Sequence, residues 1–295
     1  MACNATNDSF KGDKDAIERI AYELCEDQSN CGIIYFEARY SPHLLCSTVK
    51  NHVNSDHVGD ALTPQGVVEA VKRGLDRGEA EFGVKARSIL CCICGYADWN
   101  KEVLELATTM KEYGVVGIDV AGCAHGADEK YEPSVVEVFC EAANRGIHRT
   151  VHAGESGGAK EVCIAIESMK AERIGHGYRL LRDEDAYKKH ALEERIHLEG
   201  CPYSSVMTGS VPLDWPAHPI KRWAEDGVNF SLSTDYPTCF DNSVISELHL
   251  AKKLIGLSTH QLWLCQVNAA RNCFLEENEK NLLVEKILAA EPPAL

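Results

Sequence analysis

Residues 115–154 determine the predicted fold; they read VVGIDVAGCAHGADEKYEPSVVEVFCEAANRGIHRTVHAG. Two short apolar runs, VVGIDVAG (115–122) and IHRTVHAG (147–154), enclose PSVVEVFCEAANRG (133–146), whose apolar residues recur at helical spacing. A strand, a helix and a second strand in this order form a unit in which the two strands lie parallel.

The same alternation continues in both directions along the chain. Further strand-like runs lie at 32–40, 84–93, 173–177, 195–202 and 228–235, and helical patterns lie at 64–83 and at 100–114, which ends at Gly114. Seven strands with helical spacers predict an α/β fold of the (β/α)8 TIM-barrel type, one strand short of the usual eight. An open doubly wound sheet is the alternative, although no G-x-G-x-x-G follows a first strand.

Length and composition indicate one folded domain. The chain has 295 residues, of which 45% are hydrophobic and 25% charged, and it contains no Pro/Ser-rich linker. We therefore expect a single domain over 1–295. The formal net charge of −15 argues against partners with an anionic surface, so neither nucleic acid nor a membrane is expected. We expect a monomer.

The cysteines and the N-terminus predict a reducing, cytoplasmic location. The 14 cysteines are irregularly spaced, no apolar run precedes the first charged residues, and no stretch is long enough to span a membrane. Cys91, Cys92 and Cys94 lie in the apolar run SILCCIC. We interpret them as small buried hydrophobic residues, because no second cysteine pair follows at zinc-finger spacing.

Residues capable of catalysis collect where the predicted strands end. His152 ends one strand and Glu155 lies in the next turn, His176 lies between two glycines, and Asp235 precedes a turn that starts at Pro237. In a parallel barrel the active site lies at these ends. A single histidine there is more commonly structural, but two histidines, a glutamate and an aspartate at three strand ends favour a metal-dependent hydrolase.

His148 provides a contrast on the same strand as His152. It lies four residues earlier, which corresponds to ~13 Å at the usual rise of a strand. The two side chains cannot share one metal ion, and we interpret His148 as structural.

Several segments resemble the adenosine deaminase family, in the family's order and over nearly the whole chain. They are IERIAYELCED, YFEARYSPHLL, FGVKARSILCC, GIHRTVHAGE, ERIGHGYRLL and CPYSSVMTG. The resemblance implies a zinc-dependent hydrolase with a (β/α)8 barrel, which acts on a C–N bond of a cyclic amidine. It converts adenosine or deoxyadenosine to inosine and ammonia in purine metabolism.

The resemblance also implies a role for each candidate residue. His152 and Asp235 are expected to bind one zinc ion, which activates a water for attack on C6 of the purine. His176 orients that water and helps to move its proton, whereas Glu155 protonates N1 of the ring. The backbone N–H of Gly122 is expected to contact the purine.

The sequence departs from the family in three places. The family begins with a strand that carries His-x-His, which supplies two more zinc ligands, whereas none of the 12 histidines here lies two residues from another. We therefore expect an N-terminally incomplete barrel. Tyr236 replaces an aspartate that contacts N7 of the purine, and Cys123 and Ala124 replace an acidic pair.

These departures leave two alternatives open. With two protein ligands zinc would bind poorly, because catalytic zinc usually has three. One alternative is a non-catalytic relative that binds a purine or a protein partner. Another is a barrel amidohydrolase with a different substrate.

Overall fold

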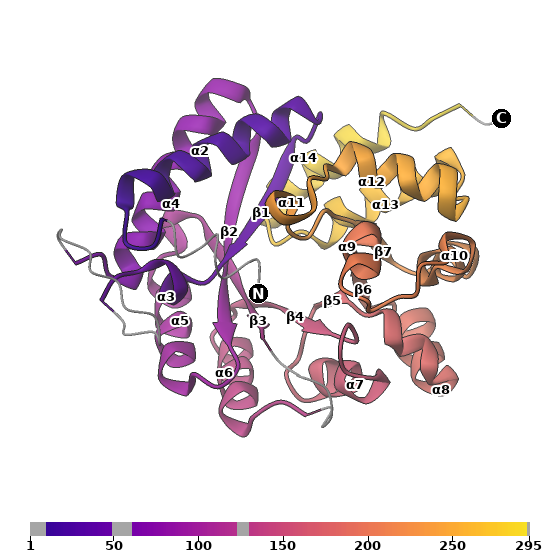
Figure 1. The fold of residues 1–295 in the computed structure, drawn as a ribbon, viewed down its shortest axis with the longest axis horizontal. Helices are drawn as coiled ribbons and strands as arrows, with labels where there is room; N and C mark the ends of the chain where they lie inside the picture. Colours follow the sequence, from indigo (N-terminus) through magenta and orange to yellow (C-terminus); the bar gives the residue numbers. More distant parts are fainter. Residues whose placement is uncertain (1–9, 49–60, 123–129, 294–295) are drawn as a thin grey trace. The chain divides into compact units, whose positions relative to one another are not determined.

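The computed structural model describes residues 10–48, 61–122 and 130–293, and it consists of two compact units, Met1–Asp119 and Val120–Leu295. Figure 1 shows the course of the chain through both. The expected single domain over 1–295 stays a prediction.

The first unit combines parallel strands with helices that follow or precede them. Strands β1 and β2 pair in parallel, with Tyr35 opposite Lys85 and Tyr40 opposite Leu90. The elements are α2 (Lys14–Asn30), β1 (Tyr35–Tyr40), α3 (Pro42–Leu45), α4 (Pro64–Phe82), β2 (Lys85–Ile93), α5 (Ala97–Thr109), the short helix η1 (Lys111–Tyr113) and β3 (Val115–Ala121), which runs into the second unit.

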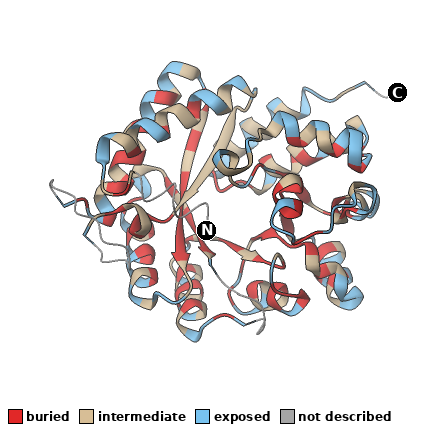
Figure 2. Ribbon diagram, viewed as in Figure 1, coloured by how far each residue is buried: buried red, intermediate tan, exposed pale blue. Residues whose placement is uncertain are grey.

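Helix α4 shows how local sequence sets the helix ends. The hydroxyl of Thr63 accepts a hydrogen bond from the Gly66 N–H at the first turn, Pro64 occupies the first helical position, and Gly83 ends the helix with φ of 70°. Gly74 lets α4 pack closely on α2, since a Cβ there would lie 2.2 Å from the Glu18 carbonyl oxygen. Buried side chains of α2 and α4 form one core with α3 and β2 (Figure 2).

The second unit contains four parallel strands and the remaining helices. Its register places His152 opposite Gly175 and Ala153 opposite His176. The strands are β4 (His148–Ala153), β5 (Arg173–His176), β6 (His197–Gly200) and β7 (Phe230–Leu232). The helices are α6 (Pro133–Asn144), α7 (Ala159–Glu167), η2 (Tyr178–Arg182), α8 (Glu184–Tyr187), η3 (Lys188–Glu193), α9 (Pro202–Met207), η4 (Trp215–Ala217), α10 (Pro219–Glu225), α11 (Pro237–Phe240), α12 (Val244–Leu250), η5 (Ala251–Ile255), α13 (Thr259–Asn272) and α14 (Glu277–Leu288).

The strands confirm the predicted fold class. All seven predicted strands are present, and they are ordered β1 to β7 as in the sequence. A doubly wound sheet would break this order, so that alternative is wrong. The helix predicted at 100–114 is in fact shorter: α5 ends at Thr109, and the separate turn η1 leads to Gly114, whose φ is 78°.

The cysteines partly correct the prediction from sequence. Cys91 and Cys92 are buried free thiols, as expected, and burial raises the pKa of both. Cys94 is instead half-buried and disulfide-bonded.

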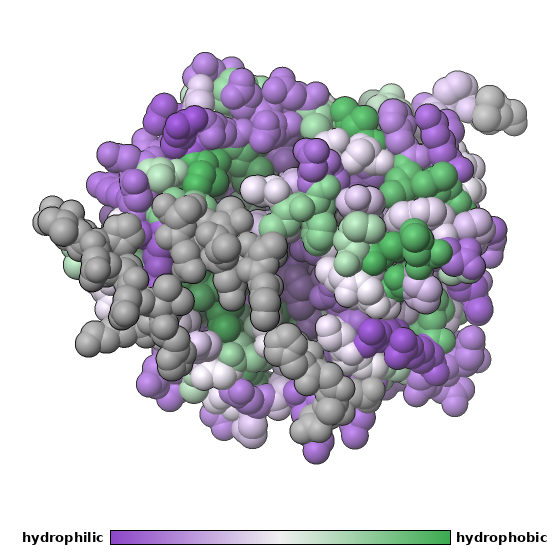
Figure 3. Space-filling model, in the orientation of Figure 1, coloured by the Kyte–Doolittle hydropathy of each residue, from purple (hydrophilic) through white to green (hydrophobic). Residues whose placement is uncertain are grey.

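Part of the molecular surface is strongly hydrophilic. Hydrophilic side chains gather over α2 at the upper left of Figure 3. No helix in the described part of the chain combines the length and apolar character needed to cross a bilayer.

Candidate active site

The end of β4 presents His152 and Glu155 through a tight turn. Gly154 adopts φ of 69°, and its N–H donates to Oε2 of Glu161, 2.7 Å away in the first turn of α7. The Tyr131 hydroxyl donates to the His152 carbonyl oxygen over 2.8 Å. The sequence H-A-G-E therefore forms a turn held from two sides, with the His152 ring half-buried and Glu155 beside it.

The end of β5 presents His176 in an unusual backbone conformation. His176 has φ of 68°, and Gly177 follows with φ of 77°. The Gly177 N–H donates to the Ala153 carbonyl oxygen over 2.9 Å, which ties this turn to the end of β4. His176 is buried, with 3% of its surface exposed. Both glycines of G-H-G are closely packed, since a Cβ would lie 3.4 Å from Cα of His152 at Gly175 and 3.0 Å from Cδ2 of Leu198 at Gly177.

Asp235 follows β7 and also has a positive φ, 64°. Its Oδ2 accepts a hydrogen bond of 2.6 Å from the hydroxyl of Ser204 on α9, while the residue as a whole is exposed. Tyr236, the next residue, is half-buried and precedes α11.

These side chains converge within the second unit. Ligand atoms of His152, His176 and Asp235 all lie within 4.8 Å of one another. The His152 and His176 rings are tilted at 56°, with centroids 5.3 Å apart. Nε2 of His176 lies 3.5 Å from Oε2 of Glu155. The structure thus brings together all four residues predicted to carry the chemistry.

Two hydroxyl groups hold the other oxygen of Glu155. The hydroxyls of Thr208 and Ser210 lie 3.2 and 3.3 Å from Oε1 of Glu155, in the turn after α9. The Glu155 side chain is 25% exposed. Oε1 is therefore bound to the protein, whereas Oε2 faces His176.

The donor set fits a metal ion such as zinc. Imidazole nitrogens and a carboxylate oxygen are ligands that zinc takes in catalytic sites, at distances of about 2 Å. Ligands around one tetrahedral ion lie about 3.4 Å apart on this basis, so only small side-chain rotations would gather the three groups. The metal ligands predicted from sequence were His152 and Asp235, and the geometry adds His176 to the residues that could hold the ion.

Burial shifts the pKa values of titratable groups around the site in the direction of their neutral forms. Burial raises the pKa of the Tyr178 hydroxyl well above its usual value, with smaller contributions that include the charge of Asp235. Burial also raises the pKa of Glu247, which accepts the Tyr203 N–H, and lowers that of His218 to about 4.

The remaining predicted residues have different positions. Gly122 follows β3 with φ of 76° and is exposed, and Cys123 and Ala124 lie outside the described residues. His148 bonds Glu172 over 2.7 Å and stacks on Phe274, which agrees with a structural role. Sequence reasoning missed Ser204, Thr208, Ser210 and Glu161. Their only sequence signal is their place just after a predicted strand end.

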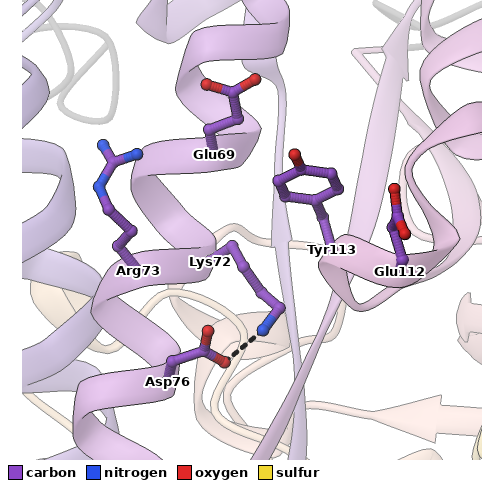
Figure 4. A pocket seen from close by; sticks show the side chains of 6 residues that line it. All are labelled: Glu69, Lys72, Arg73, Asp76, Glu112 and Tyr113. Atoms are coloured by element: carbon purple, nitrogen blue, oxygen red, sulfur yellow. Dashed lines mark hydrogen bonds and ion pairs between the residues drawn. The ribbon is translucent and has the colours of Figure 1, made fainter.

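A separate hollow of about 550 Å³ lies in the first unit, between α4 and η1 (Figure 4). Its lining is mostly charged and consists of Glu69, Lys72, Arg73, Asp76, Glu112 and Tyr113. Lys72 pairs with Asp76, and Arg73 with Glu18, so both cations are already neutralised.

A parallel (β/α) fold with histidines and carboxylates at its strand ends is typical of metal-dependent hydrolases. The family model described as adenosine deaminase matches residues 6–290. An adenosine deaminase from Danio rerio is 42% identical over 279 residues, which are 95% of this chain and 77% of the relative. The chain therefore belongs to the adenosine deaminase family of hydrolases.

Solved structures agree on the fold. An adenine deaminase from Arthrobacter aurescens matches with a TM-score of 0.79 and 22% identity, covering 94% of this chain and 80% of the other. An Arabidopsis protein named ADAL, complexed with IMP, matches with a TM-score of 0.78 and 26% identity, covering 94% and 78%.

Proposed function

We propose that this site catalyses the zinc-dependent hydrolytic deamination of adenosine, and of deoxyadenosine, to inosine and ammonia. The convergence of His152, His176 and Asp235 within 4.8 Å, with Glu155 beside His176, carries the proposal. The 42% identity to a relative named adenosine deaminase supports the substrate. The neighbour complexed with IMP supports a small purine ligand.

Each residue has a role that suits its position. His152 and Asp235 would hold the zinc ion, which when bound supplies a Lewis acid that activates a water. Nε2 of the buried His176 orients this water and accepts its proton. Glu155, whose Oε2 lies 3.5 Å from Nε2 of His176, delivers a proton to N1 of the purine.

Two further residues would bind the purine. The exposed backbone of Gly122 offers its N–H to the ring, and the Tyr236 hydroxyl takes the place of a carboxylate near N7. A tyrosine hydroxyl can donate or accept a hydrogen bond, so this exchange changes the recognition of N7 without abolishing it. We also propose that the chain acts as a cytoplasmic monomer with one barrel domain.

Turnover of adenosine by this chain should be slow. The chain supplies His152, His176 and Asp235 but no His-x-His pair, and each missing ligand weakens a zinc site considerably. The same observation, with Tyr236 beside Asp235, favours a second candidate function, the binding of a purine nucleoside without deamination.

Zinc content and turnover of the purified chain test the proposal. Zinc per protein is measured by elemental analysis, and conversion of adenosine to inosine is followed by ultraviolet absorbance. We expect substoichiometric zinc and slow conversion that rises with added zinc and disappears in His152→Ala. Purine binding by calorimetry without any conversion would favour the second candidate. Stoichiometric zinc with rapid conversion would show that unrecognised ligands complete the site.

A further inference from the structure

Helix α9 connects the ends of β5 and β7 through two hydrogen bonds. At its start, the Cys201 N–H donates to the hydroxyl oxygen of Tyr178 over 2.6 Å, and Tyr178 lies two residues after His176. Within α9, the Ser204 hydroxyl donates to Oδ2 of Asp235 over 2.6 Å. A short rigid segment therefore spans from the turn that carries His176 to the side chain of Asp235.

Ser204 is the fixed member of the pair that it forms with Asp235. Ser204 is completely buried, whereas Asp235 is exposed and lies in a strained left-handed conformation. Among the described residues, Ser204 is the only one that bonds the Asp235 carboxylate. Because its one proton is directed at Oδ2, the other oxygen, Oδ1, is left for an external ligand.

Helix α9 is held in place by contacts that do not involve the site. The Ser205 hydroxyl bonds Nε2 of His218 at 3.0 Å, and the Tyr203 N–H donates to Oε2 of Glu247 at 3.0 Å. Ser204 would thus keep its position whether or not a metal ion is bound.

We propose that Ser204 is a positioning residue for the metal site, which holds the Asp235 carboxylate in place beside His152 and His176. The inference rests on the proposed metal site. Hydrogen bonds from neighbouring groups orient ligating carboxylates, and their loss typically weakens metal binding by about 10- to 100-fold. Ser204 acts through Asp235 and touches neither metal nor substrate.

The test titrates the full chain with zinc ions by calorimetry, in wild type, Ser204→Ala, Asp235→Asn and the double variant. We expect Ser204→Ala to weaken zinc binding at least tenfold. In the Asp235→Asn background the same substitution should have no further effect, since Ser204 then has no ligand to position. The comparison of these four variants separates the two roles. If Ser204 had only a general structural role, Ser204→Ala would weaken zinc binding in both backgrounds.

Ser205→Ala is the matched control, because Ser205 is equally buried on the same helix but its hydroxyl faces His218. It should lower the melting temperature yet leave zinc affinity within twofold. Equal weakening by Ser205→Ala, or by Ser204→Ala in both backgrounds, would overturn the inference. The inference would also be overturned if Ser204→Ala left the zinc affinity unchanged while Asp235→Asn weakened it. In that case the proposed metal site would still be supported. Equal zinc affinity in wild type and Asp235→Asn would overturn the proposed metal site itself. The absence of detectable zinc binding in both would do the same.

Discussion

His176 and Asp235 follow different strands, β5 and β7, and both hold their backbone in the left-handed region, with φ of 68° and 64°. Only three other non-glycine residues in the described ranges have a positive φ, namely Lys170, Arg195 and Asp241. The conformation costs about 1–2 kcal/mol for a residue with a Cβ. Strain of this kind collects at functional sites, where a side chain must be directed to a particular point.

The strain at Asp235 predicts a specific order of stabilities. Asp235→Gly and Asp235→Ala remove the same carboxylate, but only glycine relieves the left-handed backbone. We expect Asp235→Gly to have the higher free energy of unfolding, by about 1 kcal/mol, in urea denaturation.

Ser233 provides the control for this pair of variants. It is exposed, lies two residues earlier and is absent from the residues with positive φ. At Ser233 glycine should be less stable than alanine. Equal stability of the two variants at position 235 would contradict the strain.

Local sequence patterns predicted most of the fold. Apolar runs at strand length and helical spacing between them identified all seven strands, because these patterns reflect which side chains are buried. The pattern could not separate α5 from η1, since the apolar spacing continues through 100–114 although the backbone changes at Met110.

The candidate site was predictable only for residues at strand ends. His152, His176 and Asp235 come together because parallel strands end at one edge, which the sequence shows. Ser204 and Glu161 could not be identified, because a serine after Cys-Pro or a glutamate in a first helical turn is usually exposed. Their burial depends on tertiary packing around α9 and α7. The disulfide of Cys94 likewise depends on contacts that spacing does not reveal.

A buried ion pair in the second unit predicts an asymmetric response to mutation. Nε of Arg173 lies 2.8 Å from Oε1 of Glu199, and both side chains are at most 10% exposed. Arg173→Met leaves a buried carboxylate without its cation and should lower the free energy of unfolding by about 3–5 kcal/mol. Adding Glu199→Leu removes that charge and should restore most of the loss. Chemical denaturation measures both variants, and a double variant as unstable as the single one would contradict the explanation.

His218 predicts a loss of stability in mild acid. Its Nδ1 accepts the Ile220 N–H at 3.2 Å, and Nε2 bonds Ser205, so the buried ring fits only the neutral form. Burial lowers its pKa to about 4, compared with 6.5 for an ordinary histidine. Below pH 6.5 His218 binds a proton in the unfolded chain, whereas in the folded chain it stays neutral down to about pH 4. The free energy of unfolding therefore decreases as the pH falls across this interval.

The expected loss from His218 between pH 7 and pH 5 is about 2 kcal/mol. Urea unfolding at the two pH values measures it. His218→Gln should have a smaller difference between them by that amount, even where the substitution lowers stability at both. An unchanged pH dependence in His218→Gln would mean that other groups cause the loss.

Zinc should stabilise the chain only at high concentration, and only through His152 and Asp235. Weak binding predicts that a chelator leaves the melting temperature of the purified chain unchanged. Stabilisation by a ligand grows as the logarithm of its concentration over its dissociation constant, and reaches about 1.4 kcal/mol at ten times that constant. A zinc titration, monitored by thermal unfolding, should therefore show no shift in melting temperature at low micromolar zinc and an increasing shift above it.

Free thiols could also bind zinc, and eleven are present among the described residues. His152→Ala is the matched control, because it keeps every cysteine and should abolish the shift. A shift of equal size in His152→Ala would place the zinc elsewhere, and a large drop in melting temperature with chelator would show that the site binds tightly as it stands.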